Sequence, residues 1–188
     1  MLNYTTVYYC LSFLALSVAL NFWLTFKLLK VVNAISPPET SASSLSIGSE
    51  MLSFNGILLS TEQTFDFYTT SPVFSILLFM STKCDKCKEN LQELESLYAL
   101  SDTLGLAIWL IFTDQPRHVR YFLNQSSLLS VAVKVTNKTS IKLNPHRISP
   151  YYLFIDENRR IQTSGLMGDK EWTRFQDQIS NMQTDEQS

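Results

Sequence analysis

The chain of 188 residues is poor in several features that would narrow its interpretation. It has three cysteines, too few for a fold built on several disulfides. Its formal net charge is −2, and it has no clustered basic face of the kind that marks nucleic-acid-binding proteins. It has no charged residue between positions 7 and 26. The remaining composition, 45% hydrophobic and 17% charged, predicts one globular domain with an appendage.

The uncharged segment 7–26 predicts a membrane anchor, because about 20 apolar residues in a helix cross the hydrocarbon core once. Tyr8 and Trp23 near its ends suit the membrane interface. A cleavable signal peptide is the alternative, but no Lys or Arg precedes the segment and no small-residue cleavage motif follows it. We therefore predict a lipid-bound transmembrane anchor within residues 1–30.

The rest of the chain divides into a linker, a domain and a tail. Residues 31–49 are rich in serine and contain a Pro-Pro pair, which predicts a linker. Residues 50–182 alternate strand and helix patterns, which predicts an α/β domain with a mixed sheet flanked by helices. Residues 183–188 are a polar tail. We expect strands over 56–60, 64–68, 74–80, 105–113, 131–135, 151–155 and 160–164, and helices over 84–100, 116–125 and 169–182.

The most informative stretch joins a buried strand to a helix that carries two cysteines. The apolar residues 74–80 lead through the polar turn 81–83 into an amphipathic helix over 84–100. Cys84 and Cys87 are spaced i, i+3, so they share one helix face and are close enough to form a disulfide. Cys84 stands at the helix start, where free N–H groups and the helix dipole favour a thiolate. This arrangement predicts a redox centre.

The order of elements resembles the thioredoxin fold, and more closely the membrane-anchored TlpA/ResA family of thiol–disulfide oxidoreductases. Residues 81–88 (Ser-Thr-Lys-Cys-Asp-Lys-Cys-Lys) are similar to the MauD-type variant of that family. Residues 148–156 (Ile-Ser-Pro-Tyr-Tyr-Leu-Phe-Ile-Asp) supply a second match. The resemblance implies that Pro150 is cis and faces the disulfide. Ser149 and Pro150 would then form a substrate groove, with the Ser149 backbone free to pair with an extended substrate.

The chain departs from the usual pattern of this family in three places. No tryptophan stands directly before Cys84, and Asp85-Lys86 replaces the usual Gly-Pro or Pro-Pro pair between the cysteines. The strand pattern 74–80 contains no acidic residue to move protons. Lys83 and Lys86 would favour the Cys84 thiolate and Asp85 would oppose them. The direction of electron flow, as reductase, oxidase or isomerase, stays open.

The predicted function is a thiol–disulfide oxidoreductase in which Cys84 attacks a substrate disulfide and Cys87 resolves the mixed disulfide. It needs no cofactor beyond its own redox-active disulfide. We predict no metal site, because His118 and His146 lie too far apart for an H-x₃₋₅-H unit. A binding module, or a copper or zinc chaperone, that uses the cysteine pair without turnover is the alternative.

The expected partners are protein thiols or disulfides and a thiol electron-transfer partner, either soluble or embedded in the membrane; nucleic acid is not expected. Two observations conflict on the side of the membrane that holds the domain. Lys27 and Lys30 follow the apolar segment and favour a cytoplasmic domain. The family resemblance favours an extracytoplasmic one, and we predict a single-pass protein with its C-terminal domain outside the cytoplasm.

Overall fold

A computed structural model describes residues 4–35, 45–70 and 73–185 of the chain. The chain divides into two compact units, residues 1–42 and 43–188, which are described separately. Most of the predicted linker, residues 36–44, lies outside the described residues. Residues 186–188 of the predicted tail lie outside them as well.

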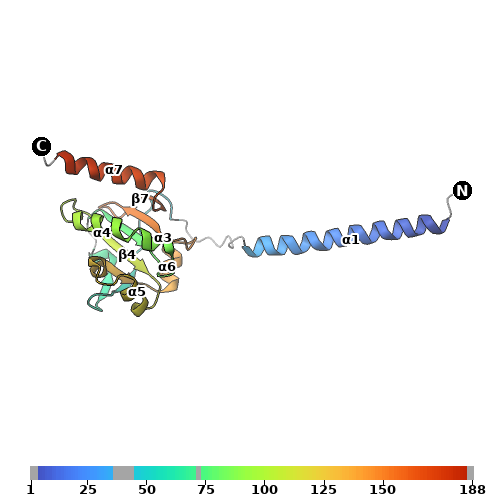
Figure 1. The fold of residues 1–188 in the computed structure, drawn as a ribbon, viewed down its shortest axis with the longest axis horizontal. Helices are drawn as coiled ribbons and strands as arrows, with labels where there is room; N and C mark the ends of the chain where they lie inside the picture. Colours follow the sequence, from blue (N-terminus) through green and yellow to red (C-terminus); the bar gives the residue numbers. More distant parts are fainter. Residues whose placement is uncertain (1–3, 36–44, 71–72, 186–188) are drawn as a thin grey trace. The chain divides into compact units, whose positions relative to one another are not determined.

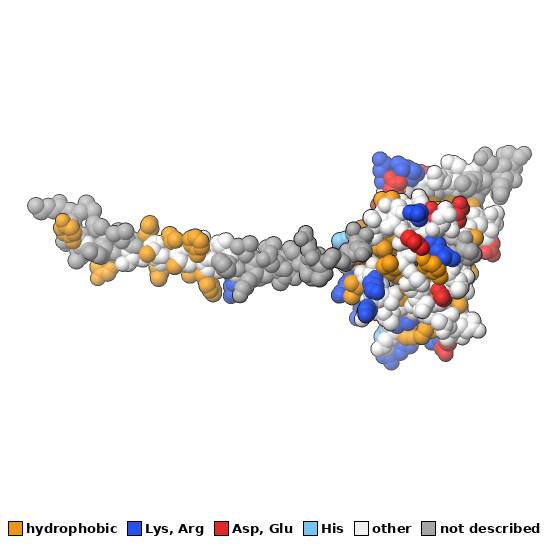
Figure 2. Space-filling model, turned by 180° about the vertical axis from the view of Figure 1, so that it is seen from behind, with side chains coloured by type: hydrophobic (Ala, Val, Ile, Leu, Met, Phe, Trp, Pro, Cys, Tyr) orange, Lys and Arg blue, Asp and Glu red, His pale blue; other side chains and the backbone are white. Residues whose placement is uncertain are grey.

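The first unit contains one long helix, α1 (Tyr4–Ile35), which includes the whole uncharged segment. Consecutive side chains over residues 12–25 are exposed, so apolar groups face outward on every side of the helix. Figure 2 shows these apolar side chains along the described part of the helix. Within residues 4–35, 45–70 and 73–185, no helix combines the length and the hydropathy required for a membrane crossing.

The second unit is built on one mixed sheet with the strand order β2-β1-β5-β4-β3-β6-β7. Strands β3, β4 and β5 run parallel to one another. On one side β1 pairs antiparallel with β5, and β2 pairs antiparallel with β1. On the other side β6 pairs antiparallel with β3, and β7 pairs antiparallel with β6. This is the mixed sheet that the alternating pattern predicts. The strands are β1 (Asn55–Leu58), β2 (Thr64–Asp66), β3 (Ser75–Phe79), β4 (Ala107–Phe112), β5 (Ala132–Lys134), β6 (Tyr151–Ile155) and β7 (Ile161–Leu166).

Helices cover both faces of the sheet, and Figure 1 labels α3, α4, α5, α6 and α7. Side chains of a strand alternate between the two faces, so Leu78 belongs to the same core cluster as Leu94 of α4 and Trp172 of α7. Its neighbour Leu77 belongs to the cluster on the opposite face, with Leu143 of α6. The helices are α2 (Phe67–Thr70), α3 (Asp85–Glu89), α4 (Leu91–Leu100), α5 (Pro116–Phe122), the 3₁₀ turn η1 (Ser127–Val131), α6 (Asn137–Leu143) and α7 (Lys170–Asp185).

The central strand β3 explains why an apolar, uncharged run precedes the cysteines. All five of its residues are buried. It pairs in parallel with β4 on one side and antiparallel with β6 on the other. A strand with neighbours on both edges and helices over both faces has no solvent side, so four of its five residues are apolar. The fifth, Ser75, is buried, and its hydroxyl donates to the Val73 carbonyl at 2.8 Å.

Three local predictions need correction. The helix expected over residues 84–100 is two helices, α3 and α4, separated at Asn90. The strand expected over residues 64–68 ends at Asp66, whose carboxylate accepts a hydrogen bond from the Tyr68 N–H and starts the turn of α2. Helix α6 was not predicted at all. It begins because Thr136 caps it, accepting a hydrogen bond from the Thr139 N–H.

The folded unit begins before the predicted boundary at residue 50. The Gly48 N–H donates to the Ile161 carbonyl at 2.7 Å, and the Met51 N–H donates to Arg159 at 2.7 Å. The Arg160 guanidinium donates to the Gly48 carbonyl at 3.0 Å. The last residues of the predicted linker are therefore attached to the β6–β7 hairpin. At the other end α7 continues to Asp185, past the predicted limit of the domain.

Candidate active site

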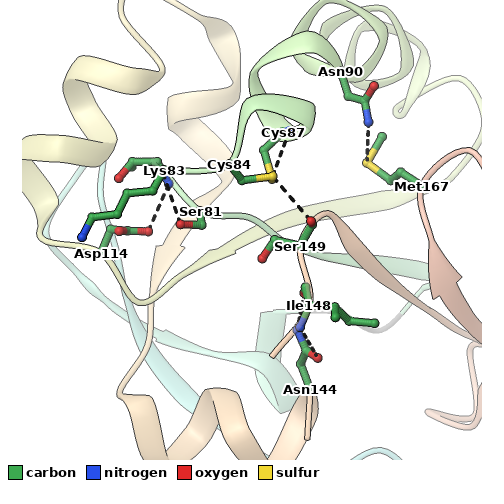
Figure 3. The surroundings of a disulfide bond; sticks show 11 residues. Ser81, Lys83, Cys84, Cys87, Asn90, Asp114, Asn144, Ile148, Ser149 and Met167 are labelled. Carbon is green, nitrogen blue, oxygen red and sulfur yellow. Dashed lines mark hydrogen bonds between the residues drawn. A yellow bond between two sulfur atoms is a disulfide. The ribbon is translucent and has the colours of Figure 1, made fainter. Parts of the chain in front are cut away.

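Cys84 and Cys87 are joined by a disulfide at the start of α3, with their Cα atoms 5.2 Å apart. Cys84 is the N-cap residue of this helix, and its sulfur accepts a hydrogen bond from the Cys87 N–H at 3.1 Å. Figure 3 shows the pair between the helix and the loop that carries Ser149. The Cys84 side chain is half-buried, whereas Cys87 is completely buried in the core beneath the helix. An incoming sulfur can therefore reach Cys84 and not Cys87.

Asn90, which separates α3 from α4, links the short helix α3 to the end of the edge strand β7. The Asn90 N–H donates to the Lys86 carbonyl and ends the helix. The Asn90 side-chain amide lies 3.9 Å from the sulfur of Met167, at the end of β7. Met167 in turn donates its N–H to the Pro150 carbonyl at 3.2 Å. Asn90 and Met167 thus link the cysteine helix to the loop opposite it.

Ser149 and Pro150 lie beside the disulfide, although they are far from it in the sequence. The Ser149–Pro150 peptide bond is cis, as the resemblance implies. The Ser149 carbonyl oxygen lies 3.4 Å from the Cys84 sulfur, a separation of 65 positions along the chain. The Ser149 N–H donates no hydrogen bond to the described part of the chain. The structure thus brings Cys84, Cys87, Ser149 and Pro150 together, and their role in binding a substrate stays a prediction.

Asn144 positions this loop and was not singled out from the sequence. It is 3% exposed, and its side chain holds both backbone groups of Ile148. Its amide donates to the Ile148 carbonyl at 2.7 Å, and its carbonyl accepts from the Ile148 N–H at 3.4 Å. The signal available in the sequence was the Asn144-Pro145 pair, a turn-forming dipeptide shortly before Ser149.

Asp114 supports the turn that precedes Cys84 and was also missed. Its carboxylate accepts a hydrogen bond from the Thr82 N–H at 3.2 Å. The ammonium of Lys134 donates to the neighbouring Thr113 carbonyl. Burial lowers the pKa of Lys134, and the Asp114 charge partly opposes this shift. Asp114 follows the end of β4, and the carboxyl ends of parallel strands converge, so its position was a usable signal.

The three charged residues expected to tune the thiolate surround the helix start without contacting a sulfur. Lys83, Asp85 and Lys86 are exposed. The Lys83 N–H donates to the Ser81 hydroxyl at 3.3 Å, which shapes the turn. Their side-chain charges make no ion pair with the described residues. Their influence on Cys84 therefore stays a prediction based on proximity in the sequence.

The two histidines weighed as metal ligands are exposed and lie on different elements, His118 on α5 and His146 in the loop after α6. In the part of the chain that the structure describes, no three His, Cys, Asp or Glu side chains form a group that could hold a metal ion. The chemistry that the assembled residues can perform is exchange between a disulfide and thiols, because one sulfur is accessible and the other is shielded beside it.

Several solved structures share this architecture. A candidate thiol:disulfide interchange protein DsbE from Chlorobium tepidum is similar with a TM-score of 0.63 and 15% identity, covering 73% of this chain and 98% of its own. The thioredoxin domain of a thiol-disulfide oxidoreductase from Bacteroides vulgatus has a TM-score of 0.59 and 19% identity, covering 71% and 98%. A secreted disulfide oxidoreductase from Mycobacterium tuberculosis, homologous to E. coli DsbE, has a TM-score of 0.52 and 17% identity, covering 60% and 81%.

These similarities establish a thioredoxin-like fold for the second unit of the chain. No protein-family model and no curated protein matches the chain.

Proposed function

We propose that the chain is a membrane-tethered thiol–disulfide oxidoreductase that reduces or isomerises disulfides of exported or membrane proteins. The observation that carries this proposal is the asymmetry of the cysteine pair. Cys84 is half-buried at the start of α3 and faces Ser149, while Cys87 is 0% exposed. An accessible sulfur beside a shielded one is the arrangement that a two-step exchange requires. The names of the structures similar to the domain support the same chemistry.

The reaction starts from the reduced protein, with Cys84 as a thiolate. Cys84 attacks one sulfur of a substrate disulfide, that S–S bond breaks, and the second substrate sulfur leaves as a thiolate that takes a proton. Cys87 then loses its proton and attacks the Cys84 sulfur. The Cys84–substrate bond breaks, and the substrate leaves with both sulfurs reduced. Two electrons have passed from the protein to the substrate, and a dithiol reductant must return them.

The start of α3 stabilises the Cys84 thiolate that begins the reaction. The Cys87 N–H, which donates to the Cys84 sulfur at 3.1 Å, stabilises negative charge on that sulfur in the reduced protein.

The loop that carries Ser149 and Pro150 is suited to bind the substrate backbone. The Ser149 N–H, which has no acceptor in the described part of the chain, is available to an extended substrate strand. Pro150 has no N–H of its own, so it donates no competing backbone hydrogen bond.

Turnover by the full chain in detergent tests the proposal. Reduction of a peptide disulfide by the wild type, with dithiothreitol as the electron source, should exceed the rate for Cys84→Ser by about 1,000-fold or more. Cys10→Ser is the matched control, because it removes the third thiol and should leave turnover unchanged. If the wild type and Cys84→Ser have equal rates, the chain is a binding module rather than an enzyme.

The tether is proposed from the first unit. Residues 7–26 are uncharged, and most of the exposed side chains of α1 over residues 12–25 are apolar, the others being Ser12, Ser17, Asn21 and Thr25. A helix that is apolar all round suits lipid better than water. We place the domain outside the cytoplasm, against the weak preference of Lys27 and Lys30, and the similarity to a secreted disulfide oxidoreductase supports this side.

Protease treatment of intact cells, or of spheroplasts where an outer membrane is present, checks the topology. The domain should be digested while a cytoplasmic control protein survives. Protection of the domain until the inner membrane is lysed would place it in the cytoplasm.

The partner is proposed to be one protein or a few proteins with a disulfide to be reduced, and the MauD-type motif favours maturation of a specific enzyme. A Cys87→Ser variant cannot resolve the mixed disulfide, so it should accumulate its substrate bound to Cys84. Mass spectrometry of the trapped species identifies the partner. The Cys84→Ser, Cys87→Ser double variant is the control and should trap nothing.

A further inference from the structure

A pocket of about 280 Å³ is lined in part by Ser149, whose carbonyl oxygen lies 3.4 Å from the Cys84 sulfur. Its volume is several times the ~30 Å³ that one water molecule occupies in the liquid, so a side chain fits in it. Three apolar residues line it at the carboxyl ends of β3 and β4, and we call them its apolar floor: Phe79, Met80 and Ile111. Polar groups from the Ser81 turn, from α6 and from Ser149 form its walls.

Arg147 is the charged residue that lines this pocket. Its guanidinium makes no hydrogen bond or ion pair with the described part of the chain, so its charge is available to a ligand. By contrast, two other guanidinium groups are already paired with a carboxylate, Arg120 with Glu62 and Arg174 with Glu171. Arg147 is exposed and lines the same pocket as the apolar floor. A free guanidinium at such a pocket favours a carboxylate, which it can bind through two parallel hydrogen bonds.

The backbone that carries Arg147 is held in place. The Arg147 N–H donates to the Asn144 carbonyl at 3.0 Å, and the Asn144 side chain holds the next residue, Ile148, through both of its backbone groups. Arg147 adopts a left-handed conformation with φ of 52°, which these bonds stabilise. A loop fixed in this way loses little entropy when it binds a ligand.

Resting on the proposed function, we infer that the pocket selects substrates with an acidic side chain within about two residues of the cysteine that reacts with Cys84. The Ser149 carbonyl is 3.4 Å from the Cys84 sulfur, and Ser149 also lines the pocket. A strand paired with Ser149 advances about 3.3 Å per residue, so a side chain next to the reacting cysteine reaches the pocket. The aliphatic part of Glu packs on the apolar floor while its carboxylate pairs with Arg147.

The test uses symmetric disulfides of short peptides that are neutral except for one Glu, or its isostere Gln, placed in turn at each position within two residues of the cysteine. Full-length protein in detergent, with dithiothreitol as reductant, reduces each peptide, and kcat/KM is measured. At one position or more the wild type should prefer Glu over Gln by about tenfold. Arg147→Gln should remove this preference while keeping the rate on the Gln peptide.

Two further variants separate the pocket from the general charge of the surface. Lys138→Gln removes an exposed positive charge from the same region without altering the pocket lining, so it should keep the preference. Arg147→Lys keeps the charge and loses the paired hydrogen bonds, so it should retain an intermediate preference. Unchanged urea unfolding of each variant shows that the fold is intact.

The inference is overturned if the wild type reduces Glu and Gln peptides equally, or if Arg147→Gln keeps the preference. It is also overturned if Lys138→Gln reduces the preference as much as Arg147→Gln does, because the effect then belongs to the surface charge. Each of these results leaves the proposed function standing. Wild-type rates equal to those of Cys84→Ser would instead refute the proposed function and the inference with it.

Discussion

Two helices of the domain begin in a similar way and serve different purposes. Helix α3 begins at Cys84, whose sulfur accepts a hydrogen bond from the Cys87 N–H three positions later. Helix α7 begins after Asp169, whose carboxylate accepts a hydrogen bond from the Trp172 N–H, also three positions later, at 2.9 Å. Both side chains satisfy an N–H group that a helix start leaves unpaired.

The two caps differ in how completely they are occupied. The Asp169 carboxylate also accepts from the Leu166 N–H at 3.1 Å and from the Tyr152 hydroxyl at 3.0 Å. Gly165 leaves room for it, since a Cβ there would lie 2.0 Å from a carboxylate oxygen. The Cys84 sulfur accepts one hydrogen bond and is partly open to solvent. A fully engaged cap stabilises the fold, whereas a sparsely engaged one remains available for chemistry.

The largest expected effect is a difference in alkylation rate between Cys84 and Cys87 at the start of α3. In the reduced protein, alkylation of Cys84 should be faster than that of Cys87 by about 1,000-fold or more, because Cys87 reacts only after the core opens. The rates are measured on Cys87→Ser and Cys84→Ser, each in a Cys10→Ser background. Similar rates would show that burial does not distinguish the two sulfurs.

The next effect concerns the structural cap. Asp169→Ala should lower the free energy of unfolding by about 2–4 kcal/mol, because it removes the cap and the carboxylate that accepts from the buried Tyr152 hydroxyl. Turnover per folded molecule should stay unchanged. Urea unfolding followed by tryptophan fluorescence measures the loss, and Asp177→Ala on the exposed side of α7 is the matched control. A loss of turnover without a loss of stability would contradict the structural role.

A smaller effect comes from Tyr152. Burial, and then its hydrogen bond to Asp169, raise the pKa of Tyr152 above its usual value of about 10. The unfolded chain therefore loses this proton at lower pH than the folded domain, so the stabilisation is complete below about pH 10 and is lost as the pH rises further. Tyr152→Phe should cost about 1–2 kcal/mol at neutral pH and show a shallower alkaline decline. Parallel alkaline declines in the two proteins would remove Tyr152 as the cause.

The smallest effect tests whether Cys84 is a cap at all. Cys84→Ser and Cys84→Ala both lack the disulfide and should both lack turnover. The serine oxygen can accept the Cys87 N–H and the alanine methyl cannot, so Cys84→Ser should be more stable by about 1 kcal/mol. Urea unfolding of the two variants measures this difference. Equal stabilities would mean that the sulfur at the start of α3 contributes nothing as a cap.

The sequence predicted the features that depend on short-range spacing. The i, i+3 spacing of Cys84 and Cys87 limits how far apart the sulfurs can lie, whatever the rest of the fold. The apolar, uncharged run of β3 requires burial on both faces, which predicts a central strand. The sequence did not predict α6, because its sparse apolar residues carry little periodic signal and its start depends on the Thr136 cap. The same holds for the break at Asn90, which interrupts an otherwise regular helical pattern.

Tertiary structure decided which residues beyond Ser149 and Pro150 support the cysteine pair. Three features could be predicted from the sequence because each is a local pattern. They are the cysteine pair, the alternation of strands and helices, and the Ser149-Pro150 match. The support of the Cys84 turn by Asp114, and the clamp of Asn144 on the loop before Ser149, depend on chain segments that only the sheet brings together. The position of Arg147 over a pocket depends on them as well. Local patterns mark Asp114 and Asn144 as candidates and do not specify their partners, because the free energy that brings these segments together comes from burying the strands between them.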